Sequence, residues 1–304
     1  MLSENDTAPE IDPVELVAHV RKMLTSPGYR PPMLPGVALE VMQLSQRPKV
    51  QFGDVVALLE RDAMLAAKVL AMAQSAAFAA RSPITSLYQA TVRLGLNTLR
   101  NMVLEAALNL KVFRVPGYAE PMERLARHST AVAHITRAAC ARAPVDAGFA
   151  FACGLLHDVG FAGTLLALSE DQAFRFVPFE AMAPALDELH EEASGLMARV
   201  WNLPSTMQRA VGAHHRVSPY GKPEPTNAAL VVAEQLAWES GLGLSEPPDD
   251  ADPMSIATPE APLDGLDLTC SVTLDEACRV LALDGLALAA LRAEAFELAK
   301  RMAA

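Results

Sequence analysis

The chain has 304 residues, of which 51% are hydrophobic and 20% charged, and its formal net charge at pH 7 is −11. This composition can build a large core and excludes a globally disordered protein. The mean hydropathy is +0.19, but the longest apolar run, residues 147–156, is about half of the roughly twenty residues that a membrane-spanning helix needs. The sequence predicts one large domain or two closely packed ones, with no membrane segment.

Cysteine usage and the first residues indicate the compartment. The chain starts with MLSENDTAPEID, an acidic and polar segment unlike a secretory signal. Its four cysteines include no C-x-x-C pair, and a chain of this length does not depend on disulfides for a core. We expect reduced thiols and a cytoplasmic location. The cysteines are Cys140, Cys153, Cys270 and Cys278.

Most of the negative charge lies in one stretch. Residues 245–276 contain nine acids, five prolines and no lysine or arginine. Because these nine acids account for most of the net charge, the rest of the chain is nearly neutral and has no basic stripe. A general nucleic-acid binder needs such a stripe, so that class is excluded. Prolines interrupt helices, and we therefore predict an acidic, proline-rich loop over residues 243–272.

The remainder of the chain is predicted to be helical. Apolar residues recur at spacings of three and four, and polar capping residues precede several of these segments. No sustained alternation of period two and no internal repeat of fixed period is found, which favours an all-α fold. The predicted helices cover residues 12–25, 34–44, 54–60, 64–74, 86–94, 97–113, 119–142, 146–157, 184–201, 204–215 and 226–240.

We predict a two-part helical bundle with an additional C-terminal segment. A lead-in with one helix (1–29) is followed by two helical subdomains, 30–115 and 116–242. After the acidic loop, Thr273-x-x-Glu276 forms a capping box for a final helical segment, 273–304. Leucines from Leu281 to Leu291 give this segment an apolar face, so we expect it to pack back on the bundle.

The histidines carry the functional signal. Two pairs of adjacent residues, His157-Asp158 and His214-His215, each stand at the end of a predicted helix. The chain leaves helical geometry there, so both side chains of a doublet can face one pocket, and Gly160 supplies a permissive turn. Imidazole and carboxylate together suit a divalent ion such as Fe, Mn, Ni or Zn.

The order of these residues resembles that of a known superfamily. His128, the pair His157-Asp158, His190, the pair His214-His215 and Glu234 follow one another like the ligands of the HD superfamily of metal-dependent phosphohydrolases. CGLLHDVG (153–160) resembles its G-L-L-H-D-I-G signature, and AVGAHH (210–215) resembles its downstream half.

The N-terminal half resembles one branch of that superfamily. PPMLPGVALEVMQL (31–44), RDAMLAAKVLAMAQSAAF (61–78) and PITSLYQATVRLGLNTLRNMVL (83–104) are similar to the motifs of the HDOD family. Ala63 stands where that family usually has proline, and Gln74 where it has asparagine. The resemblance covers about residues 30–242 and implies an HD-like helical core in a signalling-associated protein.

The resemblance implies one or two divalent ions (Fe, Mn, Ni or Zn) and assigns their ligands. His157 and Asp158 would then be the catalytic residues of an active enzyme. Glu234 replaces the usual aspartate with a longer arm. The remaining histidines, His19 and His134, should lie elsewhere. The first ion would be held by His128, His157, Asp158 and Glu234, and the second by Asp158, His190, His214 and His215.

Two departures bear on activity. Related cyclic-dinucleotide phosphodiesterases carry a lysine directly after the H-D-x-G motif, and this chain has Phe161 there. Residues 214–225, HHRVSPYGKPEP, also do not reproduce the His-His-Glu…Gly-Tyr-Pro loop that recognises cyclic di-GMP. The resemblance therefore does not extend to a cyclic di-GMP hydrolase.

Two function classes stay open. A regulatory module would transmit a signal to a protein partner, with a bound metal or nucleotide as its input, and a homodimer is compatible with it. A metal-dependent phosphohydrolase would act on a nucleotide or another phosphoester. Phe161 and the missing recognition loop favour the module, whereas the near-complete ligand set favours the enzyme. A polar core network without metal is the third reading of the histidine cluster.

Overall fold

The computed structural model describes residues 12–44, 49–75, 84–174, 177–244 and 270–303. Within these ranges the regular secondary structure is helical, with no strand, so the predicted all-α class is confirmed. The helices are α1 (Pro13–Thr25), α2 (Gly36–Leu44), α3 (Phe52–Leu59), α4 (Ala63–Ala73), α5 (Leu87–Leu94), α6 (Leu96–Lys111), α7 (Ala119–Ala139), the 3₁₀ turn η2 (Cys140–Arg142), α8 (Ala147–Leu156), α9 (Val159–Glu170), α10 (Phe179–Val200), α11 (Ser205–Val211), α12 (Pro225–Glu239), α13 (Cys270–Val280) and α14 (Gly285–Ala303).

Helix starts follow polar caps. The side chain of Asp62 accepts a hydrogen bond from the Leu65 N–H, and Asp146 does the same for Phe149. Each bond satisfies one of the donors that the first turn of a helix leaves free. The same device begins α1 at Asp12 and α5 at Ser86. This is why the helix starts predicted at these positions agree with the structure to within a residue or two.

The structure differs from the predicted helices at α9, α10 and α11. Helix α9 was not predicted, because it is buried on nearly every side and its sequence, VGFAGTLLALSE, has no amphipathic period. Helix α10 begins at Phe179 and contains Pro184, which was predicted to start it. A proline in the second turn removes one N–H···O bond and the helix continues past it. Helix α11 ends at Val211, four residues before its predicted end.

The C-terminal segment corrects one prediction and agrees with another. Helix α13 begins at Cys270, so Thr273 is not its cap and the loop predicted to reach 272 ends earlier. Most of that acidic loop, residues 245–269, lies outside the described residues. Helix α13 packs on α12, and α14 packs on α7 and α12. Arg292 of α14 also donates to both carboxylate oxygens of Glu239 at 2.6 and 3.3 Å, so the segment packs back as expected.

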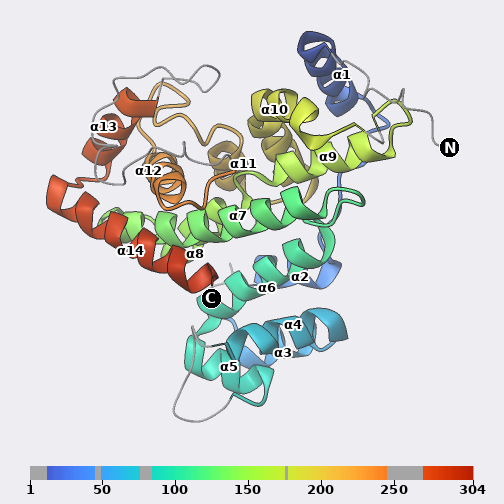
Figure 1. The fold of residues 1–304 in the computed structure, drawn as a ribbon. Coiled ribbons are helices and arrows are strands. Elements are labelled where there is room, and N and C mark those ends of the chain that lie inside the picture. Colours follow the sequence, from blue (N-terminus) through green and yellow to red (C-terminus); the bar gives the residue numbers. More distant parts are fainter. Residues whose placement is uncertain (1–11, 45–48, 76–83, 175–176, 245–269, 304) are drawn as a thin grey trace.

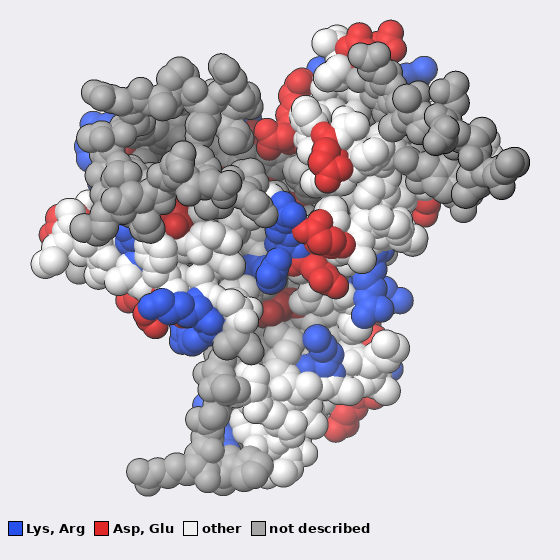
Figure 2. Space-filling model, in the orientation of Figure 1, with Lys and Arg blue, Asp and Glu red and all other residues white. Residues whose placement is uncertain are grey.

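The long helices surround a central region (Figure 1). Helices α7 and α8 run side by side across the middle, with α9 and α10 on one side and α12 to α14 on the other. Helices α2 to α6 form the lower part of this view, where α6 contacts α8. The division into subdomains at residues 115 and 116 stays a prediction. On the face in Figure 2, acidic and basic side chains are intermixed rather than gathered into one basic surface.

One described stretch, Ala147–Glu170, is long and apolar enough to cross a membrane by length and composition. It comprises α8 and α9, which the pair His157-Asp158 separates. Of its apolar window, 89% is buried inside the protein. Burial in the core accounts for its apolar character.

A buried acid in α6 makes stability depend on pH. Burial raises the pKa of Glu105 from 4.5 to about 7, although Lys68 and Thr130 beside it act in the opposite direction. Between these two pH values the folded state binds more protons at this site than the unfolded state, so the stability contributed here falls as pH rises. We expect Glu105→Gln to remove this fall and to exceed the wild type at pH 8 by on the order of 1–2 kcal/mol.

Chemical denaturation at pH 5, 6.5 and 8 measures this effect. The exposed Glu123 of α7 offers a matched control, and Glu123→Gln should leave the pH profile unchanged. Parallel wild-type and Glu105→Gln profiles would show that Glu105 does not titrate in this range.

Candidate metal centre

The turn between α8 and α9 carries His157 and Asp158. The N–H of Gly160 donates to the hydroxyl of Ser194 in α10 at 2.8 Å. A Cβ atom at Gly160 would overlap backbone atoms of His190 and Ser194. Only glycine therefore allows this turn to approach α10 so closely. This approach brings Asp158 close to His190.

The other predicted ligands come from four further places. His128 is on α7, His190 on α10 and Glu234 on α12, while His214 and His215 lie in the turn after α11. The structure brings all seven predicted ligands into one cluster, and five of them are buried; His215 is 46% exposed at its side chain and Glu234 21%. His19 and His134 lie elsewhere, beside Asp171 and Arg137 respectively.

Four imidazoles are held by the same kind of hydrogen bond. The Nδ1 atoms of His157, His190 and His214 lie 2.5–2.8 Å from the carbonyl oxygen three residues earlier. The Nδ1 atom of His128 lies 2.8 Å from the carbonyl of Leu242. A carbonyl only accepts, so each Nδ1 carries a proton and each ring turns its Nε2 atom into the cluster.

The Nε2 atoms meet at close range. Those of His128 and His157 are 3.2 Å apart, and so are those of His190 and His214. Where both rings of a pair are neutral, with protons on Nδ1, no hydrogen lies between their Nε2 atoms. A cation between the rings, either a metal ion or a proton, removes this conflict, and the bond from the other ring nitrogen to a carbonyl is typical of metal-ligating histidines.

Asp158 lies between the two pairs. Its Oδ2 is 3.5 Å from Nε2 of His128 and 3.2 Å from that of His157. Its Oδ1 is 3.5 Å from Nε2 of His190 and 3.4 Å from that of His214. Each oxygen of this one carboxylate thus faces a different pair of imidazoles, which is the arrangement that a carboxylate shared by two ions needs.

Glu234 sits differently from the position that the family resemblance assigns. Its Oε1 lies 3.9 Å from Nε2 of His157 and 3.6 Å from that of His214, while Oε2 lies 2.9 Å from Nε2 of His215. Its carboxylate therefore contacts histidines of both assigned groups. The extra methylene of glutamate carries the oxygens past the first pair toward His214 and His215.

Protonation follows from burial and from these neighbours. Burial favours the neutral form of Asp158, but His157 beside it holds the pKa of the carboxyl well below its usual range. Burial lowers the pKa of His128 and of His190. These are the ionised carboxylate and neutral imidazoles that a metal ion requires.

Two other histidines retain protons more strongly. Burial favours neutral His157, yet Asp158 raises the pKa of His157 above its usual value. Burial acts on His215 in the same way, but Glu234 raises the pKa of His215 to about 10. In the protein without metal, a proton on His215 partly compensates the carboxylate of Glu234.

The donor set fits a divalent metal. Three overlapping groups of side chains have ligand atoms within 4.8 Å of one another. Asp158 Oδ1 and Glu234 Oε1 are buried and have no hydrogen-bond partner, and both face imidazole nitrogens. Nitrogen and carboxylate donors in this number suit Fe, Mn, Ni or Zn. The groups are His190, His214 and His215; His128, His157 and Asp158; and His157, His214 and Glu234.

The sequence analysis did not identify the residues that hold the ligands in place. The buried amide of Asn227 donates to the carbonyls of Ala210 (3.3 Å) and Ala213 (2.7 Å), which fixes the turn that carries His214. Glu191 accepts from the N–H of His215 at 2.9 Å. The only sequence signal for Asn227 is its spacing of seven from Glu234, which puts both on one face of α12.

Two further contacts lie at the border of the metal centre. Phe161 is 6% exposed, and its ring centroid lies 6.1 Å from those of His190 and Phe179. On the opposite side, Arg124 of α7 donates to the carbonyl of Leu244 at 3.1 Å, close to the carbonyl of Leu242 that binds His128. An aromatic ring and a backbone segment thus border the centre.

The contact at Gly160 can be tested by a single methyl group. We expect Gly160→Ala to lower the free energy of unfolding by about 1–3 kcal/mol, because the helices must separate. The same separation moves Asp158 from His190, so Mn²⁺ affinity should fall at least about tenfold. The control is Gly53→Ala, since a Cβ at Gly53 meets nothing within 4 Å. Unchanged stability and Mn²⁺ affinity in Gly160→Ala, measured by denaturation and titration, would contradict this account.

Comparisons with known proteins bear on the family and the fold of the chain. The HDOD domain family matches residues 32–217. A protein of Treponema pallidum (strain Nichols), named an uncharacterized protein, is 26% identical over 197 residues. The match covers 61% of this chain and 38% of that protein, so the chain spans well under half the length of this relative.

Several solved structures share the fold. A "Putative metal-dependent phosphohydrolase" of Shewanella amazonensis is 17% identical, with a TM-score of 0.67 over 95% of this chain and 98% of that one. An HDOD domain protein with unknown function from Geobacter sulfurreducens is 21% identical, with a TM-score of 0.62 over 94% and 99%. A "Putative signal transduction protein" of Marinobacter aquaeolei is 19% identical, with a TM-score of 0.60 over 96% and 68%.

At these identities the structural likeness establishes the fold alone. The family match rests on sequence and covers more than half of the chain. The chain belongs to the HDOD family.

Proposed function

We propose that this chain is a signal-transduction protein whose HD-type centre holds one or two divalent ions. The observation that carries the proposal is the convergence of four oriented Nε2 atoms on the two oxygens of Asp158. The signalling role is supported by the family and by the named function of the Marinobacter structure. We infer a cytoplasmic protein that acts on a signalling partner.

The residues of the site have different roles. When bound, a divalent ion supplies Lewis-acid chemistry to a phosphoester or charge to a regulatory site. From the α8–α9 turn, His157 and Asp158 lie within 4 Å of four other members of the cluster, His128, His190, His214 and Glu234. The backbone carbonyls hold the imidazoles in one tautomer, and Asn227 with Glu191 holds the turn of His214 and His215.

Phe161 favours a regulatory role over hydrolysis of cyclic di-GMP. Its buried ring lies beside His190, where related phosphodiesterases place a lysine. A fixed ammonium group would pair with a substrate phosphate, and charge-assisted contacts are about twice as strong as neutral ones. An aromatic ring supplies no such charge.

A metal-dependent phosphohydrolase is the second candidate, because one specific observation favours it. The donor set is complete, and Asp158 faces both halves of it. A site that had lost its metal would be free to lose some of these donors. We therefore expect metal binding to remain under either function.

Turnover separates the two candidates. With Mn²⁺ or Fe²⁺ supplied, we expect the wild type to hydrolyse cyclic di-GMP weakly or not at all and to retain at most slow activity on simple phosphoesters. Asp158→Ala should bind Mn²⁺ at least about a hundredfold more weakly, since it removes the carboxylate that faces both histidine pairs. Its control is His19→Ala, a histidine outside the centre, which should bind Mn²⁺ like the wild type. Robust cyclic di-GMP turnover that Asp158→Ala abolishes would favour the enzyme.

Metal binding should release protons. Glu234 raises the pKa of His215 to about 10, so this ring carries a proton at pH 6–8 in the protein without metal. A metal ion bound by His215 must displace this proton, and Mn²⁺ affinity should therefore rise with pH, by about tenfold per pH unit for one displaced proton. In Glu234→Gln the pKa of His215 should fall, because its carboxylate partner is gone, and the slope should become shallower.

Competition titrations with Mn²⁺ at pH 6, 7 and 8 measure that slope. Calorimetry in two buffers of different ionisation enthalpy counts the protons directly. An affinity that does not change with pH would show that His215 is already neutral before the metal binds.

A further inference from the structure

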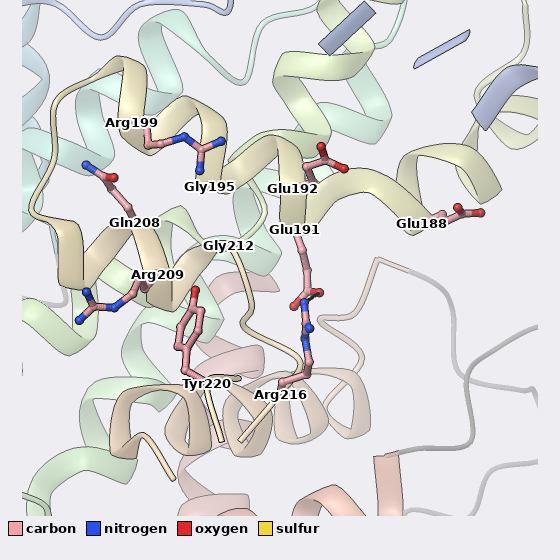
Figure 3. Close-up of a pocket in the computed structure, with 10 residues that line it drawn as sticks. All are labelled: Glu188, Glu191, Glu192, Gly195, Arg199, Gln208, Arg209, Gly212, Arg216 and Tyr220. Atoms are coloured by element: carbon pink, nitrogen blue, oxygen red, sulfur yellow. Dashed lines mark hydrogen bonds and ion pairs between the residues drawn. The ribbon is translucent and has the colours of Figure 1, made fainter. Parts of the chain in front are cut away.

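A groove lies between α10 and α11 on the outer side of the metal centre (Figure 3). Its volume is about 460 Å³, which suits a ligand of nucleotide size. Glu191 joins the groove to the metal centre, because its side chain lines the groove and accepts from the N–H of His215. The groove is therefore adjacent to the metal site but made of other side chains.

Two glycines form the floor of the groove. A Cβ atom at Gly195 would lie 3.1 Å from Cα of Gly212, and one at Gly212 would lie 3.2 Å from Cα of Gly195. The helices can therefore cross closely only because neither glycine has a side chain. This crossing leaves the backbone at the bottom of the groove, with the longer side chains around its rim.

The ion pairs at the rim of the groove leave positive charge at one end of it. Among the acids of the rim, Glu188 pairs with Arg21 and Glu191 with Arg216, each at 3.4 Å. No ion pair joins Arg199 or Arg209 within the described part of the chain. Two guanidinium groups thus remain uncompensated, against one carboxylate, that of Glu192.

Figure 3 shows how these groups are arranged. Arg199 and Arg209 lie at one end of the groove, with the guanidinium of Arg199 turned toward Gly195 and that of the exposed Arg209 turned outward, and Glu188 and Glu192 lie toward the other end. The hydroxyl of Tyr220 points toward the floor between them. Tyr220 is 58% exposed, so its ring is available to a planar group. The groove is thus polarised, with hydrogen-bond donors at one end and acceptors at the other.

We propose that this groove binds a phosphorylated small molecule of nucleotide size. Guanidinium groups present planar donors that match phosphate, and Arg199 and Arg209 would take it. The ring of Tyr220 would stack on the base, as aromatic side chains do with nucleobases. Glu192 would accept from amino groups at the far end. This inference goes beyond the metal chemistry and does not depend on it.

Calorimetric titration of the full-length protein with AMP, GMP, CMP and UMP tests the proposal, with and without a chelator. We expect at least one mononucleotide to bind saturably in both conditions, and its nucleoside to bind at least about tenfold more weakly because the phosphate is missing. Inorganic phosphate should compete. Arg199→Gln and Arg209→Gln should each weaken the mononucleotide about tenfold. Both residues are exposed, so thermal unfolding should be unchanged.

Two controls separate this groove from the metal centre. Arg114→Gln changes an exposed arginine outside the groove and should leave binding unchanged. Asp158→Ala should also retain mononucleotide binding. Loss of binding in Asp158→Ala, with binding kept in both arginine variants, would place the ligand at the metal centre and overturn the groove. Absence of saturable binding by all four mononucleotides would overturn it as well. Mononucleotide binding that needs the arginines, in a protein that binds no metal, would support the groove and reject the proposed metal function.

Discussion

The burial of the Asp158 carboxylate is the constraint on which the rest of the site depends. An ionised carboxylate that is 4% exposed is costly unless charge or hydrogen bonds compensate it. Four imidazoles surround its two oxygens at 3.2–3.5 Å. They come from α7, α10, the α8–α9 turn and the turn after α11. The packing of these elements, including the contact of Gly160 with α10, thus places four ring nitrogens around one charge, and a cation among them, either a metal ion or a proton, compensates it.

Four residues of the site, His157, Asp158, His214 and His215, could be predicted from local sequence because they are close to helix ends, whereas His128, His190 and Glu234 lie inside helices and came from the family resemblance. His157 and His214 each follow a helix, where carbonyls three residues earlier are free to accept from Nδ1. Polar caps such as Asp62 and Asp146 likewise mark helix starts through local bonds. These features depend on neighbours within a few positions, and sequence patterns report such neighbours well.

The features that the sequence did not predict depend on distant partners or on weak local signals. Helix α9 has no polar face to reveal its period, and Pro184 suggests a helix start where the chain tolerates the loss of one hydrogen bond. The position of Glu234 between two groups of histidines follows from the length of its arm and the placement of α12. Asn227 acts on a turn more than ten residues away, so its role is visible only in the fold.

The carbonyl of Leu242 links the ring of His128 to the chain that follows α12. It accepts from Nδ1 of His128 and stands three residues after the end of that helix. Arg124, one turn before His128 on α7, donates to the carbonyl of Leu244. Helix α7 thus holds this stretch at two points, so a displacement of residues 242–244 would take away the acceptor that fixes the ring of His128.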